Sequence, residues 1–137
     1  MKKSILFACV GNACRSQMAE GFMRALAGDR FEVYSAGTRP AGFVASEAVQ
    51  VMKEAGIDIS SQYSKGFDRV PAKEYDYLVT MGCGETCPIV SAKERIEWQI
   101  EDPIGQPIEV FRRVRDEIKV KVEGLLSQLT RSPRPLC

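Results

Sequence analysis

The sequence of 137 residues contains no histidine. This absence excludes Ser-His-Asp and Cys-His catalysis, and it excludes zinc sites built on imidazole ligands. The five cysteines are therefore the candidates for a nucleophile, a redox group or a soft-metal ligand. Their odd number and uneven spacing do not suit a disulfide framework, so we expect a reducing, cytoplasmic location.

A charge imbalance and a long hydrophobic run are also missing. The chain carries 19 basic and 18 acidic residues, a net charge of +1. This balance gives no electrostatic footprint for sequence-independent binding of nucleic acid, so no nucleic-acid partner is expected. No segment approaches the ~20 apolar residues that a transmembrane helix needs, so no membrane association is expected. The short apolar run near the N-terminus lacks a signal-peptide cleavage pattern and predicts a buried strand.

The length fits one domain that buries its own core. We predict a single, monomeric domain over residues 1–131. Pro133 and Pro135 cannot continue a helix, so residues 132–137 are predicted to form a disordered C-terminal tail.

Hydrophobic patterning predicts alternating strands and helices. Strands are expected over residues 4–9, 31–35, 75–81 and 94–100. This alternation predicts the α/β class: a four-stranded parallel sheet with helices on both faces, a flavodoxin-like three-layer fold with its working site at the carboxyl ends of the strands. The expected buried helix faces are Met18, Phe22, Ala25 and Leu26 before a stop at Gly28; Ala48, Val51, Met52 and Ala55 between an N-cap at Ser46 and a stop at Gly56; and Phe111, Val114, Ile118, Val122, Leu125 and Leu129 after Pro107.

The loop after the first strand predicts an oxyanion site. Gly11 and Asn12 tolerate the backbone angles that turn successive N–H groups toward an anion. Arg15 offers a planar fork for a tetrahedral anion at a helix N-terminus, and the same field stabilises a thiolate at Cys9, with Ser16 as a donor. The alternative is that Cys9 is one more buried residue at a strand end. The predicted oxyanion-binding residues are Val10, Gly11, Asn12, Ala13, Cys14, Arg15 and Ser16.

This loop, read from Cys9 to Gly21, resembles the phosphate loop shared by low-molecular-weight protein tyrosine phosphatases and thioredoxin-coupled arsenate reductases. The resemblance implies a four-stranded parallel sheet with helices on both sides. It extends over nearly the whole chain to about residue 130. The further matching segments are residues 33–37, 52–60, 101–103 and 111–118.

Two features favour the reductase branch of this resemblance. Gln17 follows Arg15 and Ser16, where the phosphatases usually carry proline. Cys83 and Cys87 follow the third predicted strand, beside the loop that holds Cys9. Two further thiols near a nucleophilic thiol are what a relay of thiol–disulfide exchange requires.

The resemblance implies a mechanism with catalytic residues Cys9, Arg15, Cys83, Cys87 and Asp102. Cys9 attacks an arsenate held by Arg15 and the loop amides, and Asp102 protonates the departing oxygen. Cys83 then attacks Cys9 and releases arsenite, and Cys87 attacks Cys83. A thioredoxin-like partner reduces the product disulfide. No metal or other cofactor is needed, because the electrons pass through sulfur.

Several alternatives stay open. The first is a protein tyrosine phosphatase that uses Cys9, Arg15 and Asp102 alone, and the second is a non-catalytic binder or sensor of arsenic or oxyanions. The four cysteines before the tail could also form a metal site, or the pair Cys83 and Cys87 could be inert. Only three residues separate this pair, where the best-known relatives have six, so the order of the pair stays open. Glutaredoxin or a low-molecular-weight thiol is the other candidate reductant.

The resemblance also implies a set of loop-ordering residues. Some family members hold potassium with residues matching Asn12, Glu20 and Ser35 and an acidic residue at the position of Lys65. An ammonium at Lys65 can replace that ion beside Glu20, so we predict no potassium requirement. The alternative is that Lys65 is an ordinary solvated lysine.

Overall fold

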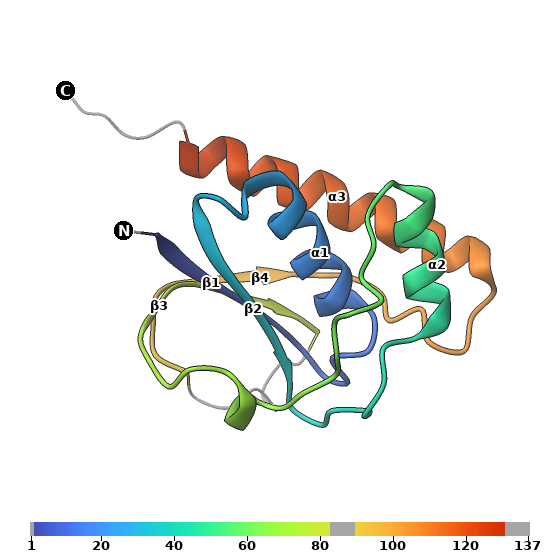
Figure 1. Cartoon of the computed structure of the whole chain (residues 1–137), viewed down its shortest axis with the longest axis horizontal. Coiled ribbons are helices and arrows are strands. Elements are labelled where there is room, and N and C mark those ends of the chain that lie inside the picture. Colours follow the sequence, from blue (N-terminus) through green and yellow to red (C-terminus); the bar gives the residue numbers. More distant parts are fainter. Residues whose placement is uncertain (1, 83–89, 131–137) are drawn as a thin grey trace.

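The computed structural model describes residues 2–82 and 90–130, with the backbone alone for Thr130. Its strands are β1 (Lys3–Cys9), β2 (Phe31–Gly37), β3 (Tyr75–Met81) and β4 (Ala92–Trp98). They form one parallel sheet in the order β2-β1-β3-β4 (Figure 1). The predicted α/β class with four parallel strands is confirmed.

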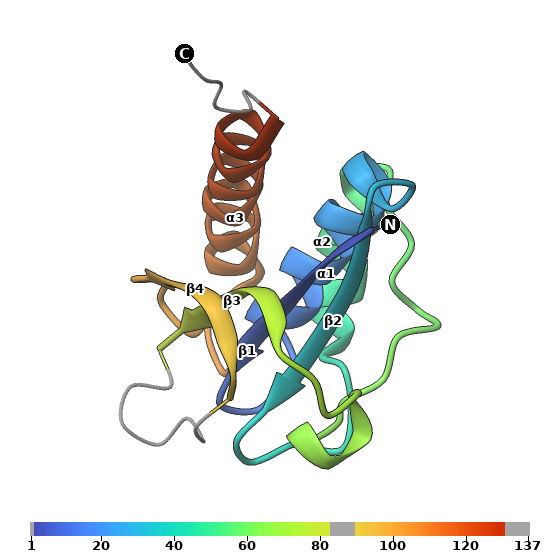
Figure 2. The same cartoon turned by 90° about the vertical axis from the view of Figure 1, so that its left-hand side faces the viewer.

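The outer layers of the fold are unequal. The α-helices are α1 (Arg15–Ala27), α2 (Ser46–Glu54) and α3 (Ile108–Thr130), and η1 (Phe67–Arg69) is a single 3-10 turn. Helices α1 and α3 pack side by side over one face of the sheet, whereas η1 lies beyond the other face (Figures 1 and 2). The β1-to-β2 and β2-to-β3 connections cross the sheet in opposite directions, so right-handed crossovers place α1 and η1 on opposite faces.

Strand β1 contributes to a core on each face of the sheet. Ile5 and Phe7 pack under the helices in the larger cluster, with Phe22 of α1 and Phe111 of α3. Leu6 lies in the smaller cluster on the face that η1 covers. Successive strand residues point to opposite faces, so a strand covered on both sides reads as a continuous apolar run. Burial of this first strand is confirmed.

The predicted buried face of the first helix is wrong in its last turns. Ala25 is exposed and Leu26 is 43% exposed, whereas Met23 and Ala27 are fully buried. Helix α1 contacts α3 as well as β2, so the first two turns are covered almost all round. In the last turns of α1, the buried side chains are Met23 and Ala27, which lie one helical turn apart on the same face.

The start of the second helix also differs from the prediction. Ser46 is the first residue of α2, and the N-cap is Ala45, which has no side-chain cap. The N–H of Ala45 instead donates to the carbonyl oxygen of Ala13 at 2.8 Å, so a contact with the loop after β1 sets this boundary. The predicted stop at Gly56 is confirmed by its left-handed φ of 83°.

The edge strands start or end where their partners do. Strand β4 spans Ala92–Trp98 rather than residues 94–100, because Met81 at the end of β3 pairs with Trp98. Strand β2 runs beyond residue 35 to Gly37, because Gly37 pairs with Cys9. These registers bring the carboxyl ends of β1, β2 and β3 to one edge of the sheet.

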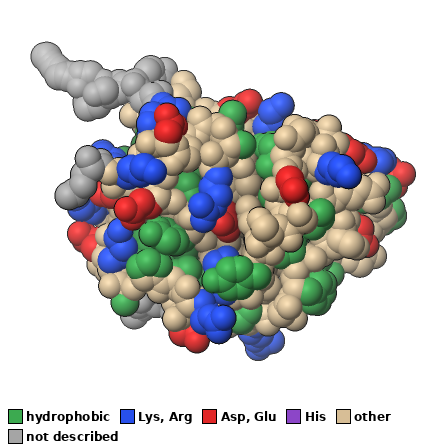
Figure 3. Space-filling view, in the orientation of Figure 1, with side chains coloured by type: hydrophobic (Ala, Val, Ile, Leu, Met, Phe, Trp, Pro, Cys, Tyr) green, Lys and Arg blue, Asp and Glu red, His purple; other side chains and the backbone are tan. Residues whose placement is uncertain are grey.

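In the part of the chain that the structure describes, no helix is long and apolar enough to cross a membrane. On the face seen in Figure 3, basic and acidic side chains are interspersed. The tail predicted over residues 132–137 lies outside the described residues.

Candidate active site

Cys9 is the last residue of β1 and is 2% exposed. Its Sγ atom lies 2.9 Å from the Oγ atom of Ser16, and the backbone N–H of Asn12 donates to the same sulfur at 3.3 Å. Two polar groups from the following loop and helix therefore meet the sulfur. A thiolate at this position has hydrogen-bond donors ready to stabilise it.

Asn12 holds this part of the loop in a left-handed conformation, with φ of 49°. Its buried Nδ2 group donates to Oγ of Ser16 at 2.8 Å and to Oγ of Ser35 at 3.1 Å. Because the Ser16 oxygen accepts this hydrogen bond, the Ser16 hydroxyl hydrogen is available to Cys9.

The segment after β2 fixes the other side of the loop. Its close approach requires a glycine at position 37, because a Cβ there would lie 2.6 Å from the carbonyl oxygen of Val10. The loop carbonyls are thus turned toward this segment, which leaves loop N–H groups for an anion on the opposite side. The backbone bonds run from Thr38 to Cys9 (3.1 Å), Arg39 to Val10 (2.8 Å), Ala41 to Gly11 (2.9 Å) and Ala45 to Ala13 (2.8 Å).

Arg15, the first residue of α1, is 6% exposed. Its Nη1 group donates to the carbonyl oxygens of Met81 at 2.9 Å and Ile100 at 3.2 Å. Its Nη2 atom lies 3.6 Å from Oδ2 of Asp102. The guanidinium is therefore held between the end of β3 and the segment after β4, within reach of the predicted general acid.

These residues surround one small cavity of about 20 Å³. The structure thus brings Cys9, Arg15 and Asp102 to one cavity, whereas the predicted oxyanion-binding residues Val10, Asn12 and Ser16 are not among its lining residues. Ile104 is a lining residue that the sequence analysis did not single out. The lining residues are Cys9, Gly11, Ala13, Cys14, Arg15, Asp102 and Ile104.

The second cysteine that lines this cavity, Cys14, is also buried. Burial raises the pKa of the Cys14 thiol well above its ordinary range, and the nearby Asp102 and Cys9 raise it further against the opposing effect of Arg15. Cys14 is therefore a neutral thiol at physiological pH, and its sulfur is unsuited to nucleophilic attack.

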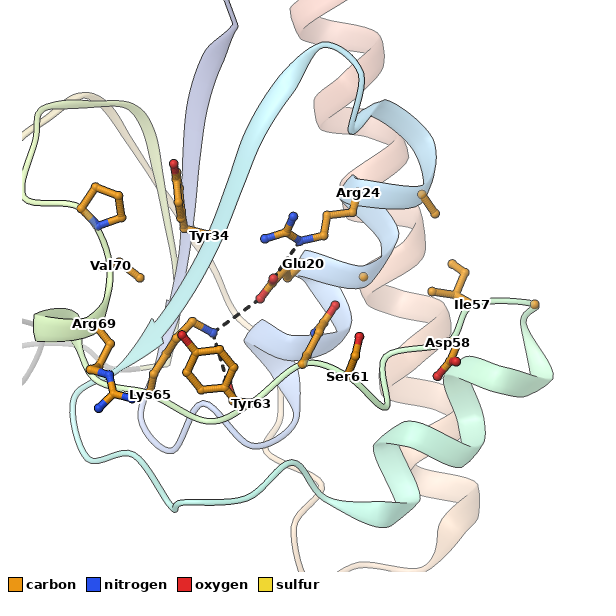
Figure 4. A pocket seen from close by; sticks show the side chains of 15 residues that line it. Glu20, Arg24, Tyr34, Ile57, Asp58, Ser61, Tyr63, Lys65, Arg69 and Val70 are labelled. Carbon is orange, nitrogen blue, oxygen red and sulfur yellow. Dashed lines mark hydrogen bonds and ion pairs between the residues drawn. The ribbon is translucent and has the colours of Figure 1, made fainter.

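The four predicted loop-ordering residues lie together beside the loop. Ser35 donates from Oγ to Oε1 of Glu20 at 2.5 Å, and Lys65 donates from Nζ to Oγ of Ser35 at 3.3 Å. The Lys65 N–H also donates to Oδ1 of Asn12 at 2.9 Å. Nζ of Lys65 lies 3.8 Å from Oε1 of Glu20 (Figure 4). Lys65 is thus a buried member of this cluster, not an ordinary solvated lysine.

Burial lowers the pKa of the Lys65 ammonium, and the Glu20 carboxylate partly offsets this effect. Arg24 shares the same carboxylate, with its Nε atom 2.8 Å from Oε2 of Glu20. A wider cavity of about 710 Å³ opens on this side of the molecule, with Tyr63 at its border (Figure 4). The carboxylate of Glu20 therefore has two cationic neighbours, one of them buried.

The sequence analysis missed the structural role of Gln17. This residue is fully buried, and its Nε2 group contacts Asn12 and the carbonyl oxygen of Tyr63. In the sequence, Gln17 stood out only through the family resemblance, as the residue that replaces the proline usual in the phosphatases. Its partners lie far along the chain and leave no local pattern.

The predicted relay cysteines, Cys83 and Cys87, lie outside the described residues. The described chain reaches Gly82, at the end of the strand next to β1. Gly82 has a φ of 81°, and a Cβ atom at this position would overlap Nη1 of Arg15. Within residues 2–82 and 90–130, no three histidine, cysteine or acidic residues lie close enough to hold a metal ion.

The fold and this site define a class of α/β proteins in which the first strand–helix loop holds an oxyanion against a cysteine. The chain belongs to the low molecular weight phosphotyrosine protein phosphatase family, which matches residues 4–134. The family resemblance seen in the sequence is thereby confirmed.

The most similar relatives include reductases. Arsenate reductase 2 of Staphylococcus haemolyticus is 44% identical over 127 residues, which is 90% of this chain and 95% of that protein. The glutaredoxin arsenate reductase of Synechocystis sp. is 40% identical over 131 residues, 93% of this chain and 99% of the relative.

Solved structures that are similar to this chain also include arsenate reductases. An arsenate reductase in the phosphate-binding state has a TM-score of 0.83 at 41% identity, and the match covers 92% of this chain and 98% of that one. A thioredoxin-dependent arsenate reductase of Corynebacterium glutamicum has a TM-score of 0.80 at 30% identity, covering 96% of this chain and 64% of that one.

Proposed function

We propose that this chain is an arsenate reductase that converts arsenate to arsenite through a thiolate of Cys9. The observation that carries the proposal is the convergence of Cys9, Arg15 and Asp102 on one cavity. The identity to arsenate reductases over about nine-tenths of the chain supports arsenate as the substrate.

In the first step, Arg15 and the loop N–H groups hold the tetrahedral oxyanion. The Cys9 sulfur attacks arsenic and forms an S–As bond. Asp102 donates a proton to a departing oxygen, which leaves as water. The position of Asp102, at the border of the same cavity as Cys9 and beside Arg15, supports this role.

In the second step, the thiolate of Cys83 attacks the Cys9 sulfur. The S–As bond breaks, its electron pair reduces arsenic from the +5 to the +3 state, and arsenite leaves. Cys87 then attacks Cys83, releases the Cys9 thiolate and leaves a Cys83–Cys87 disulfide. Two thiols thus supply the two electrons, and no metal or other cofactor takes part.

A dithiol protein of the thioredoxin class returns the disulfide to thiols. The names of a thioredoxin-dependent and a glutaredoxin-linked relative support a protein thiol as reductant. We place this reaction in the cytoplasm, with the chain as a monomer.

The family itself favours one other candidate function, hydrolysis of phosphate esters. The anion nest and Arg15 recognise charge and tetrahedral shape, which phosphate and arsenate share. Weak phosphatase activity is therefore expected alongside reduction. A true phosphatase would need Cys9, Arg15 and Asp102 and no further thiol.

The test is arsenate-dependent oxidation of NADPH, coupled through thioredoxin and its reductase and, separately, through glutaredoxin with glutathione. We expect turnover in the wild type, none in Cys9→Ser or Cys87→Ser, and full turnover in the matched control Cys137→Ser. Aryl phosphate hydrolysis should survive in Cys87→Ser. No arsenate-dependent oxidation with either reductant would overturn the proposal, and arsenate binding without turnover would point to a binder.

A further inference from the structure

Gln17 is buried, and its side-chain amide forms hydrogen bonds through both its NH₂ group and its oxygen. Its Nε2 group donates to the carbonyl oxygen of Asn12 at 3.0 Å, to Oδ1 of Asn12 at 2.8 Å and to the carbonyl oxygen of Tyr63 at 2.9 Å. All three partners are acceptors, so only the NH₂ end of the amide fits here. The Oε1 end accepts from Nε2 of Gln62 at 2.7 Å.

Asn12, which accepts hydrogen bonds from Gln17, is under backbone strain. Asn12 is a non-glycine residue at positive φ, a conformation that costs roughly 1 kcal/mol and needs compensating contacts. Its own N–H donates to the Cys9 sulfur, so its conformation sets one of the contacts to that sulfur.

We propose that Gln17 is a positioning residue for the oxyanion loop. Its amide keeps Asn12 in the left-handed conformation and so preforms the loop around Cys9. Through the carbonyl oxygen of Tyr63 it also ties the loop to the segment between α2 and η1. This inference rests on the oxyanion-binding part of the proposed function and is independent of arsenate turnover.

Two substitutions separate positioning from simple packing. Gln17→Met keeps a side chain of similar length and removes the three donor contacts. Gln17→Glu keeps the shape and directs a carboxylate oxygen at three carbonyl oxygens. A positioning role predicts weaker phosphate binding in both variants, with the larger loss in Gln17→Glu because acceptors there face acceptors. A packing role predicts wild-type phosphate affinity in folded Gln17→Met.

The matched control is Gln62→Met. The Nε2 group of Gln62 donates to the backbone oxygen of Gln17 at 3.0 Å and to the Oε1 atom of Gln17. This variant leaves all donor contacts to Asn12 in place. Its effect on the loop should therefore be small.

The experiment measures the affinity for inorganic phosphate as protection of Cys9 from iodoacetamide, mapped by mass spectrometry, with circular dichroism to establish the folded state. We expect about tenfold weaker phosphate binding in Gln17→Met, equivalent to ~1.4 kcal/mol, weaker binding still in Gln17→Glu, and a change below about twofold in Gln62→Met.

The proposal is overturned by any of four outcomes: no protection of the wild type, unchanged affinity in folded Gln17→Met, the reverse order of the two variants, or an equal loss in Gln62→Met. A variant that only loses thermal stability, with wild-type phosphate affinity, also contradicts it. Failure of arsenate turnover leaves this phosphate measurement readable, so the two proposals can fail separately.

Discussion

The Sγ atom of Cys9 lies 2.9 Å from the Oγ atom of Ser16, and the Ser16 oxygen in turn accepts a hydrogen bond from Asn12. The Ser16 hydroxyl hydrogen is therefore available to the sulfur, where it can bond the negative charge of an attacking thiolate. Ser16→Ala should lower the rate of Cys9 alkylation at neutral pH about tenfold, since a hydrogen bond to a charged group contributes about 1.5–3 kcal/mol. Mass spectrometry of the Cys9 peptide gives this rate.

The control for this prediction is Ser46→Ala. Ser46 lies in the first turn of α2 and bonds Glu47 rather than the loop. Equal alkylation rates in Ser16→Ala and Ser46→Ala would show that the Ser16 hydroxyl does not act on the sulfur.

The buried thiol of Cys14 predicts a loss of stability at alkaline pH. Its pKa is raised in the folded chain, so the unfolded chain ionises first, above the ordinary value of 9.0. The stabilisation is present below that pH and is lost as the pH rises, by up to ~1.4 kcal/mol per pH unit. Between about pH 8.5 and 10.5, the free energy of unfolding should fall about 2 kcal/mol further in the wild type than in Cys14→Ala.

Urea denaturation with a reductant present measures this difference. The pH dependence of the difference in unfolding free energy between the two proteins isolates the Cys14 thiol. The cost of the cavity that the alanine leaves does not change with pH, and the other groups titrate in both proteins. Parallel pH profiles for the two proteins would contradict the burial of a neutral Cys14.

Gly82 lies close to the guanidinium of Arg15. Gly82→Ala should place a methyl group on Nη1, displace Arg15 and weaken phosphate binding about tenfold, the scale of losing a charge-assisted hydrogen bond. Gly105→Ala is the matched control, because Gly105 has a similar φ of 85° with open space around it. Both variants should lose about 1–2 kcal/mol of stability from backbone strain.

Calorimetric titration with phosphate separates these two glycine variants. Weakened binding in Gly82→Ala alone supports the contact with Arg15. Equal binding in both variants would mean that Arg15 finds its place without this contact.

The buried ammonium of Lys65 lies 3.8 Å from Oε1 of Glu20, and we predict that it replaces a bound potassium ion. Turnover of the wild type should therefore be equal in potassium and sodium at the same ionic strength. Lys65→Met should lower phosphate affinity several-fold, since the Glu20 and Ser35 cluster loses its buried cation. Lys73→Met, which removes an exposed lysine paired with Glu32, should change neither quantity. Stimulation of the wild type by potassium would refute the replacement.

The sequence predicted those parts of the site that are local along the chain. Cys9, Asn12, Arg15 and Ser16 fall within one strand–loop–helix segment, so their spacing already implies that they meet. The parallel sheet was predicted from the alternation of strands and helices, and the continuous apolar run of β1 predicted a strand that is buried on both faces. The convergence of Asp102 on the same cavity came from the family resemblance rather than from spacing.

What the sequence could not predict depends on contacts between distant segments. The carbonyl oxygens of Met81 and Ile100 that hold Arg15 belong to backbone and have no residue signature. Ala45 became an N-cap because of its bond to Ala13, and Leu26 became exposed because the buried stripe of α1 shifts toward Ala27. Tertiary packing decided each of these outcomes over local propensity.

In the proposed reaction, the chain's own thiols supply both electrons to arsenic. The most direct measurement is arsenite formed when the fully reduced protein meets excess arsenate with no external reductant. We expect about one arsenite and one disulfide per chain in the wild type and in Cys87→Ser, and none in Cys9→Ser or Cys83→Ser. No arsenite from the wild type, or an undiminished yield in Cys83→Ser, would contradict it.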